Sequence, residues 1–153
     1  MGEGYTATTL GELPAFRDGG TSWAPIRHTL GIRGFGINAY GEAEPGAELI
    51  EDHDESDSRH EELYFVVSGA AEFTVDGQAF AAPAGTLVHV PDPATTRSAV
   101  STAPDTKVLC IGGVEGAFEP RPWEARSVAE LSDRLGALEP GGQGAQRVAD
   151  PPS

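Results

Sequence analysis

Apolar and polar residues alternate over short stretches along most of the chain, and turns containing Gly or Pro separate these stretches. A two-residue period is typical of strands that bury one face, and β-branched and aromatic residues favour strands further. The strongest example is 62–67 (Glu-Leu-Tyr-Phe-Val-Val), which ends at Ser68-Gly69. Strands are predicted within 26–40 and at 47–51, 62–67, 71–75, 78–82, 86–90, 97–100 and 107–111. Strands that recur at such short intervals predict an all-β sandwich or barrel.

The two ends of the chain have a different pattern. Residues 1–25 are interrupted by Gly and Pro, and we expect an irregular N-terminal arm with one short strand or turn. Ser127 and Glu130 match a capping box, and the apolar residues that follow have helical spacing, so a short helix is predicted over 127–138. The sequence thus predicts an arm (1–25), a β-barrel (26–120), a helical segment (121–138) and a disordered tail (139–153).

Length, charge and cysteine content narrow the class of protein. The 153 residues suffice for one domain with a core. Ten Lys and Arg against 24 Asp and Glu give a formal net charge of −14, which argues against nucleic acid and anionic membranes as partners. No apolar run approaches the ~20 residues of a membrane span, and the first residues lack a signal-peptide pattern. The single cysteine, Cys110, excludes an internal disulfide and fits a reducing compartment, so we expect a cytoplasmic protein.

One segment resembles the first sequence motif of the cupin family. Glu62 and Gly69 keep the motif's Glu-to-Gly spacing, and Pro45-Gly46 precedes them as the motif's opening glycine does. His53 stands at the first of the motif's two histidine positions, and Glu55 stands at the second.

A second segment resembles the family's other motif. Gly85 and Pro91 keep its spacing, while Pro93, Thr96 and Val100 replace its Gly, His and Asn. The resemblance covers roughly residues 35–115 and implies a double-stranded β-helix, or jelly-roll barrel, here followed by the short C-terminal helix. It also implies a homodimer and a site inside the barrel, where members of the family commonly hold Fe, Mn, Ni, Zn or Cu with three His and one Glu.

The candidate metal ligands follow from this resemblance and from the remaining histidines. His53 and Glu62 stand at motif positions, whereas Thr96 supplies no ligand. His89 lies within the 86–90 strand and is our third candidate. Imidazole and carboxylate donors that converge from neighbouring strands are what a divalent metal requires. Glu55 belongs to a strongly acidic stretch, so we expect it at the surface.

Three further residues could contact a ligand. Tyr64 and His60 share the strand period of Glu62, so both could face the interior; the alternatives are a packed core aromatic and a residue at the rim. Arg97 could bind a substrate carboxylate or pair with one of the many acids. We therefore take His53, Glu62 and Tyr64 as catalytic candidates, and Tyr64, His60 and Arg97 as substrate-binding candidates.

Two functions fit these residues. The first is an enzyme that acts on an organic metabolite inside the barrel, using a divalent metal held by His53 and Glu62 or acid–base chemistry; isomerase, cyclase, decarboxylase and dioxygenase reactions all remain open. The second is a non-catalytic ligand-binding or sensor protein without metal. No helix-turn-helix region is visible, which disfavours a transcription factor.

Overall fold

A computed structural model gives the structure of the chain and describes residues 4–119, 121–124 and 126. The chain divides into two compact units, Met1–Val114 and Glu115–Ser153. In the second unit, residues 122–124 and 126 are helical, while the helix predicted over 127–138 and the tail at 139–153 lie outside the described residues. None of the described helices has the length and apolar character that a membrane span requires.

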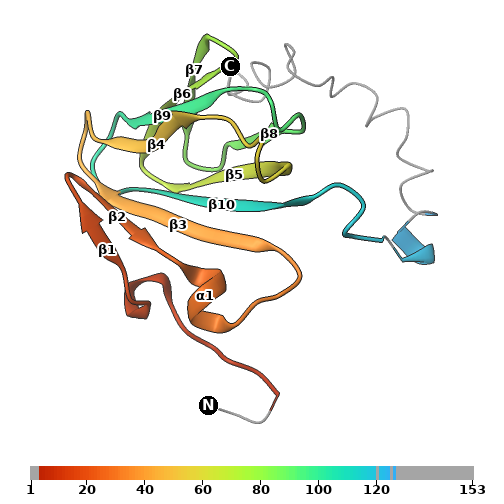
Figure 1. Ribbon diagram of the computed structural model, residues 1–153. Helices are drawn as coiled ribbons and strands as arrows, with labels where there is room; N and C mark the ends of the chain where they lie inside the picture. Colours follow the sequence, from red (N-terminus) through yellow and green to blue (C-terminus); the bar gives the residue numbers. More distant parts are fainter. Residues whose placement is uncertain (1–3, 120, 125, 127–153) are drawn as a thin grey trace. The chain divides into compact units, whose positions relative to one another are not determined.

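The first unit consists of two antiparallel sheets (Figure 1). Its strands are β1 (Phe16–Asp18), β2 (Thr21–Ala24), β3 (Gly36–Ala43), β4 (Glu48–His53), β5 (His60–Ser68), β6 (Ala70–Val75), β7 (Gln78–Pro83), β8 (Leu87–Val90), β9 (Arg97–Ser101) and β10 (Thr106–Val114). One sheet has the order β1-β2-β3-β10-β5-β8 and the other the order β4-β9-β6-β7. The all-β prediction is therefore confirmed, and every strand predicted from residue 47 onward is present.

The core lies between the two sheets and is built from alternate residues of their strands. In β5 the inward residues are Glu62, Tyr64 and Val66, all buried, and the residues between them are more exposed. The rings of Tyr64 and Phe73 join the two sheets, with centroids 5.6 Å apart. Apolar residues in the same core include Leu49, Ile50, Val88, Val90, Ala99 and Val108. This alternation carries the polar Glu62 into the interior along with its apolar neighbours.

The N-terminal arm is more regular than predicted. It forms a 3-10 turn, η1 (Leu10–Glu12), and then the hairpin β1–β2, and β2 extends the larger sheet beyond β3. Leu10 and Leu13 pack with Ala39 of β3 and Leu109 of β10 in a second apolar cluster. Ala39 is opposite Leu109 in the β3–β10 register and points away from the main core, so the arm covers the outer face of this sheet.

The strand predicted to begin at residue 26 is wrong over its first part. Residues Ile26–Leu30 form a short helix, α1, and β3 begins only at Gly36. The backbone N–H of Thr29 donates to the Pro25 carbonyl at 3.0 Å, and Gly31 ends the helix in the left-handed conformation at φ 68°. A single helical turn is too short for its apolar spacing to be distinguished from that of a strand.

Gly69 alone connects β5 to β6, in the left-handed conformation at φ +71°. A Cβ atom at this position would lie 2.6 Å from the Cα of Thr106. Thr106 is fully buried, and its hydroxyl lies 2.7 Å from the carbonyl oxygen of Ala103, so it has no room to move away. The connection therefore requires glycine both for its backbone angles and for space.

We expect Gly69→Ala to lower the free energy of unfolding by about 3 kcal/mol, because left-handed strain and a backbone clash add together. The matched control is Gly77→Ala, where φ is similar at +75° but no atom of the described residues lies within 4 Å of the added Cβ. Left-handed strain alone predicts a loss of about 1 kcal/mol there. Urea denaturation measures both losses, and equal losses would contradict the packing argument.

Candidate functional site

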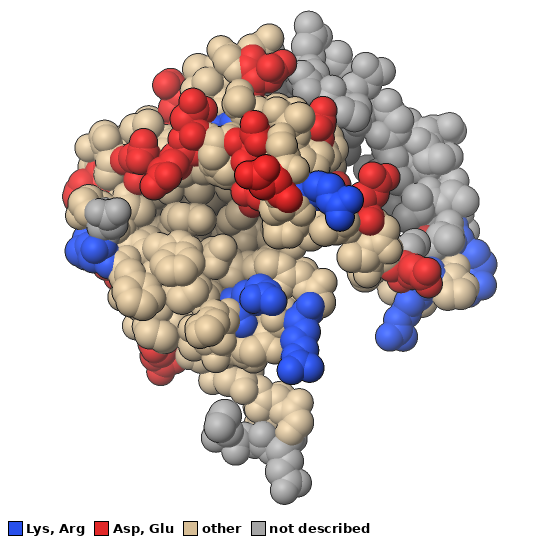
Figure 2. All heavy atoms as spheres, in the orientation of Figure 1, with Lys and Arg blue, Asp and Glu red and all other residues tan. Residues whose placement is uncertain are grey.

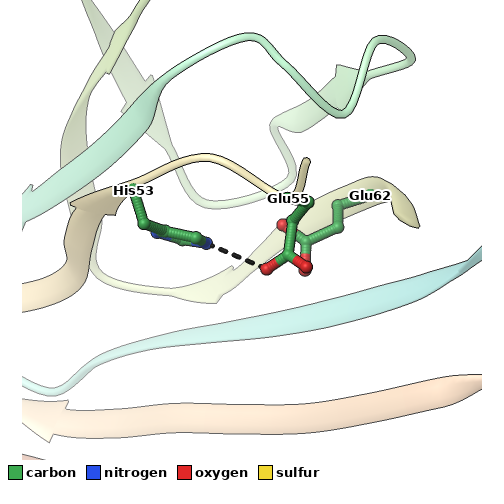
Figure 3. A group of neighbouring side chains, drawn as sticks. All are labelled: His53, Glu55 and Glu62. Carbon is green, nitrogen blue, oxygen red and sulfur yellow. Dashed lines mark ion pairs between the residues drawn. The ribbon is translucent and has the colours of Figure 1, made fainter. Parts of the chain in front are cut away.

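The face of the molecule seen in Figure 2 is hollowed between the two sheets, and Asp and Glu side chains gather above the hollow. Three candidate donor side chains converge in the interior (Figure 3): His53 at the end of β4, Glu55 in the connection that follows, and Glu62 in β5. Each offers one ligand atom, and these atoms all lie within 4.8 Å of one another. The two motif residues, His53 and Glu62, are thus brought together, and Glu55 joins them.

Glu55 is not the surface residue that its acidic neighbourhood predicted. Its side chain is only 20% exposed, because the β4–β5 connection folds back on itself. The Glu55 N–H donates to the Pro93 carbonyl at 2.7 Å, and the N–H of Arg59 donates to the Glu55 carbonyl at 2.7 Å. These backbone bonds fix the turn, and the hydroxyl of Ser58 donates to the carboxylate itself.

The His53 ring is oriented by its own backbone. Nδ1 lies 2.7 Å from the carbonyl oxygen of Glu51, which can only accept, so Nδ1 must be the donor. In a neutral ring, Nε2 then carries a lone pair, yet it lies 3.3 Å from Oε1 of Glu55, another acceptor (Figure 3). Two acceptors at this distance are stable only when a proton or a cation lies between them.

Glu62 is held by donors from three strands. Its Oε2 accepts from the Tyr64 hydroxyl and lies 3.5 Å from Nε of Arg97, and its Oε1 accepts from the Cys110 thiol at 3.3 Å. Burial raises the pKa of Tyr64 and of Cys110, and the negative charge of Glu62 raises both pKa values further. Both groups therefore keep their protons at neutral pH and remain donors to Glu62.

Arg97 is fully buried beside Glu62. Its Nη1 donates to the carbonyl oxygens of Thr95 and Pro93 at 2.8 and 3.4 Å, whereas Nε and Nη2 make no hydrogen bond in the described part of the chain. Because Arg97 has 0% exposure, direct binding of a substrate carboxylate does not fit this structure. The alternative, an ion pair with an acid, is the arrangement observed.

Of the remaining residues singled out in the sequence, one lies in the interior, one at the edge of the cluster and one at the surface. Tyr64 faces the interior, but its hydroxyl is used by Glu62 and is not free for a ligand. His60 lies at the edge of the cluster, 40% exposed, with Nδ1 3.8 Å from Oε2 of Glu55. Thr96 stands where the second cupin motif has its histidine, and it is exposed. The next residue, Arg97, points inward instead.

His89 does not lie with His53 and Glu62, so its prediction as a ligand in the barrel interior is wrong. In the β5–β8 register it is opposite Leu63, while Glu62 is opposite Val90, which places His89 on the outer face. Its side chain is 55% exposed, and Nε2 lies 3.2 Å from Oε2 of Glu61, which is also exposed.

Two residues that line the inner face of β3 were not among those predicted from the sequence. Asn38 is opposite Cys110 and Tyr40 is opposite Val108, so both face the interior. Burial raises the pKa of Tyr40, and the negative charges of Glu62, Glu55 and Glu51 raise it further, so its hydroxyl lies within electrostatic reach of the site. The sequence pattern favours the opposite face, because polar Asn38 and Tyr40 alternate with apolar Ile37 and Ala39, which pack in the second apolar cluster.

The raised pKa of Cys110 predicts a loss of stability at alkaline pH. The folded thiol stays neutral, whereas the unfolded thiol ionises above its usual value of 9.0, so the stability is full below that value and falls as the pH rises past it. Between pH 8 and pH 10 the wild type should lose about 1 kcal/mol more than Cys110→Ala. Urea denaturation with a reductant at both values measures this difference, and equal losses in the two proteins would contradict it.

Solved structures of other proteins share this architecture. A cupin protein from Bacteroides fragilis is 21% identical and matches 79% of this chain and 93% of its own, with a TM-score of 0.59. A predicted oxalate decarboxylase from Thermotoga maritima is 15% identical over 71% of this chain and 99% of its own (TM-score 0.60). A cupin-superfamily sugar phosphate isomerase from Silicibacter pomeroyi is 17% identical over 70% and 74% (TM-score 0.56).

These similarities are in three-dimensional structure. No protein-family model and no curated protein matches the chain by sequence. The paired antiparallel sheets, the inward carboxylate at the first motif's glutamate position and the solved neighbours agree with one another. The chain therefore has the cupin fold, the double-stranded β-helix.

Proposed function

We propose that the barrel binds a divalent metal ion through His53, Glu55 and Glu62 and is an enzyme acting on a small organic molecule beside it. One observation carries this proposal. Nε2 of His53, which carries a lone pair when the ring is neutral, lies 3.3 Å from a carboxylate oxygen of Glu55, and a carboxylate oxygen of Glu62 lies within 4.8 Å. Such convergent lone pairs repel one another unless a positive species lies among them.

The residues around the three donors fit a metal. The Glu51 carbonyl fixes the His53 ring with Nε2 directed to the site, as outer hydrogen bonds do for histidine ligands. Oε2 of Glu62 is occupied by Tyr64 and Arg97. Among the described residues Oε1 accepts only from the Cys110 thiol, so it keeps a lone pair for a ligand bond. One imidazole and two carboxylates suit Mn, Fe, Ni or Zn. When bound, such an ion stabilises negative charge that develops on a substrate oxygen.

The proposed reaction class rests on the site and only secondarily on the fold. Structural neighbours include a predicted oxalate decarboxylase and a sugar phosphate isomerase, which differ in chemistry. The reactions open to this site are isomerisation, cyclisation, decarboxylation and oxygenation of an organic metabolite. Tyr64 acts as a positioning residue, because its hydroxyl holds Glu62.

A specific observation favours a second candidate, a ligand-binding protein without metal. Arg97 already places a buried positive charge 3.5 Å from Glu62. A proton on Nε2 of His53 would equally satisfy its contact with Glu55. In that case the barrel binds its ligand through hydrogen bonds and fixed charges alone.

Metal analysis after equilibration with Mn²⁺ or Zn²⁺ tests the first proposal. We expect one ion per wild-type chain. His53→Ala, Glu55→Gln and Glu62→Gln should each weaken metal affinity at least ~10-fold, because each removes one donor from a set of three. Occupancy should also fall on acidification, since neutral imidazole and ionised carboxylates are the binding forms.

The outer pair His89 and Glu61 provides matched controls. His89→Ala and Glu61→Gln remove the same kinds of side chain from β8 and β5, and both residues are exposed on the opposite face, so metal content should not change. A wild type that takes up neither ion would refute the metal site and leave the metal-free binding protein as the better explanation.

A further inference from the structure

The charge inside the barrel depends on whether a metal is bound. Glu55 and Glu62 carry two negative charges, and Arg97 carries one positive charge beside them. With His53 and His60 neutral, the cluster has one net negative charge. A divalent cation would change this to one net positive charge. The loaded cluster would therefore attract an anion that the empty cluster repels, while the Asp and Glu side chains gathered above the hollow (Figure 2) stay negative in both forms.

The inner face of β3 supplies hydrogen-bonding groups that the protein itself does not use. Asn38 and Tyr40 are both half-buried and face the interior. Neither side chain makes a hydrogen bond within the described residues. Their polar atoms are also not among the fully buried nitrogen and oxygen atoms that lack a hydrogen-bond partner. These groups are thus open to solvent inside the barrel. Tyr64 and Cys110, by contrast, both donate to Glu62.

We propose that the metal-loaded barrel binds a small organic carboxylate against Asn38 and Tyr40, and that the metal-free barrel does not bind it. This inference rests on the proposed metal site. The Asn38 amide and the Tyr40 hydroxyl donate hydrogen bonds to the carboxylate oxygens. Arg97 contributes its charge without touching the ligand, because its side chain is completely buried. Its charge is paired with Glu62 at 3.5 Å, and within the described residues its Nε and Nη2 make no hydrogen bond.

Titration calorimetry of the full chain with lactate, in Mn²⁺-loaded and metal-free forms, tests this inference. Lactamide, which has the same size but no charge, is the matched ligand control. We expect lactate to bind the loaded protein at least about tenfold more tightly than the metal-free protein, because the sign of the local charge reverses. Lactamide should show no such difference.

Variants separate the ligand contacts from the metal site. Tyr40→Phe and Asn38→Ala should each weaken lactate binding about threefold to tenfold, the effect of one lost hydrogen bond, while Mn²⁺ affinity stays unchanged. Tyr5→Phe, at a tyrosine that is 69% exposed, is the control for Tyr40→Phe. Arg97→Gln should tighten Mn²⁺ binding and weaken lactate binding, an opposite pair of changes that simple loss of structure would not produce.

The outcomes distinguish this inference from the proposed function. Mn²⁺ binding without lactate binding, or equal lactate affinity with and without Mn²⁺, overturns the inference alone. If Tyr40→Phe and Asn38→Ala both bind lactate as tightly as the wild type, these two residues are not the carboxylate contacts. A wild type that binds no metal refutes the metal site, and the metal-dependent carboxylate site fails with it.

Discussion

The interior of the barrel depends on one buried ion pair, between Glu62 of β5 and Arg97 of β9. Removing either charge from water is costly, and the pair repays that cost only with further hydrogen bonds. Tyr64 and Cys110 supply two of these to the carboxylate, and the carbonyls of Thr95 and Pro93 supply others to the guanidinium. The two sheets are therefore joined by a polar network as well as by apolar packing, and the candidate site is built on that network.

Most of the fold could be predicted from the sequence because its strands are local patterns. From residue 47 onward, apolar alternation and the glycines of the turns mark nearly every strand, and the structure confirms them. The failures lie where local pattern is ambiguous. Ile26 and Leu30 are four residues apart, a spacing that puts them on one face of a strand as well as of a helix, and here they lie in one helical turn. The hairpin of the arm pairs with β3, a contact distant in sequence.

The site was only partly predictable, because side-chain direction depends on register between strands. Glu62 and His53 stand at positions that a motif marks, and the structure brings them together. In β8, apolar residues lie on both faces of the strand, so the sequence does not reveal that His89 faces outward. Glu55 turns inward through a backbone bond to Pro93, nearly forty residues away along the chain, which no local pattern encodes.

The thiol of Cys110 gives this interior a built-in chemical reporter. Only the thiolate reacts readily with alkylating reagents, and both burial and the neighbouring Glu62 keep this thiol protonated. Reagent can therefore reach and modify it mainly in molecules whose barrel has opened. The rate of alkylation of the single cysteine then measures how often the sheets separate around Glu62. Any ligand that holds the two sheets together would slow that reaction, whether or not it is a substrate.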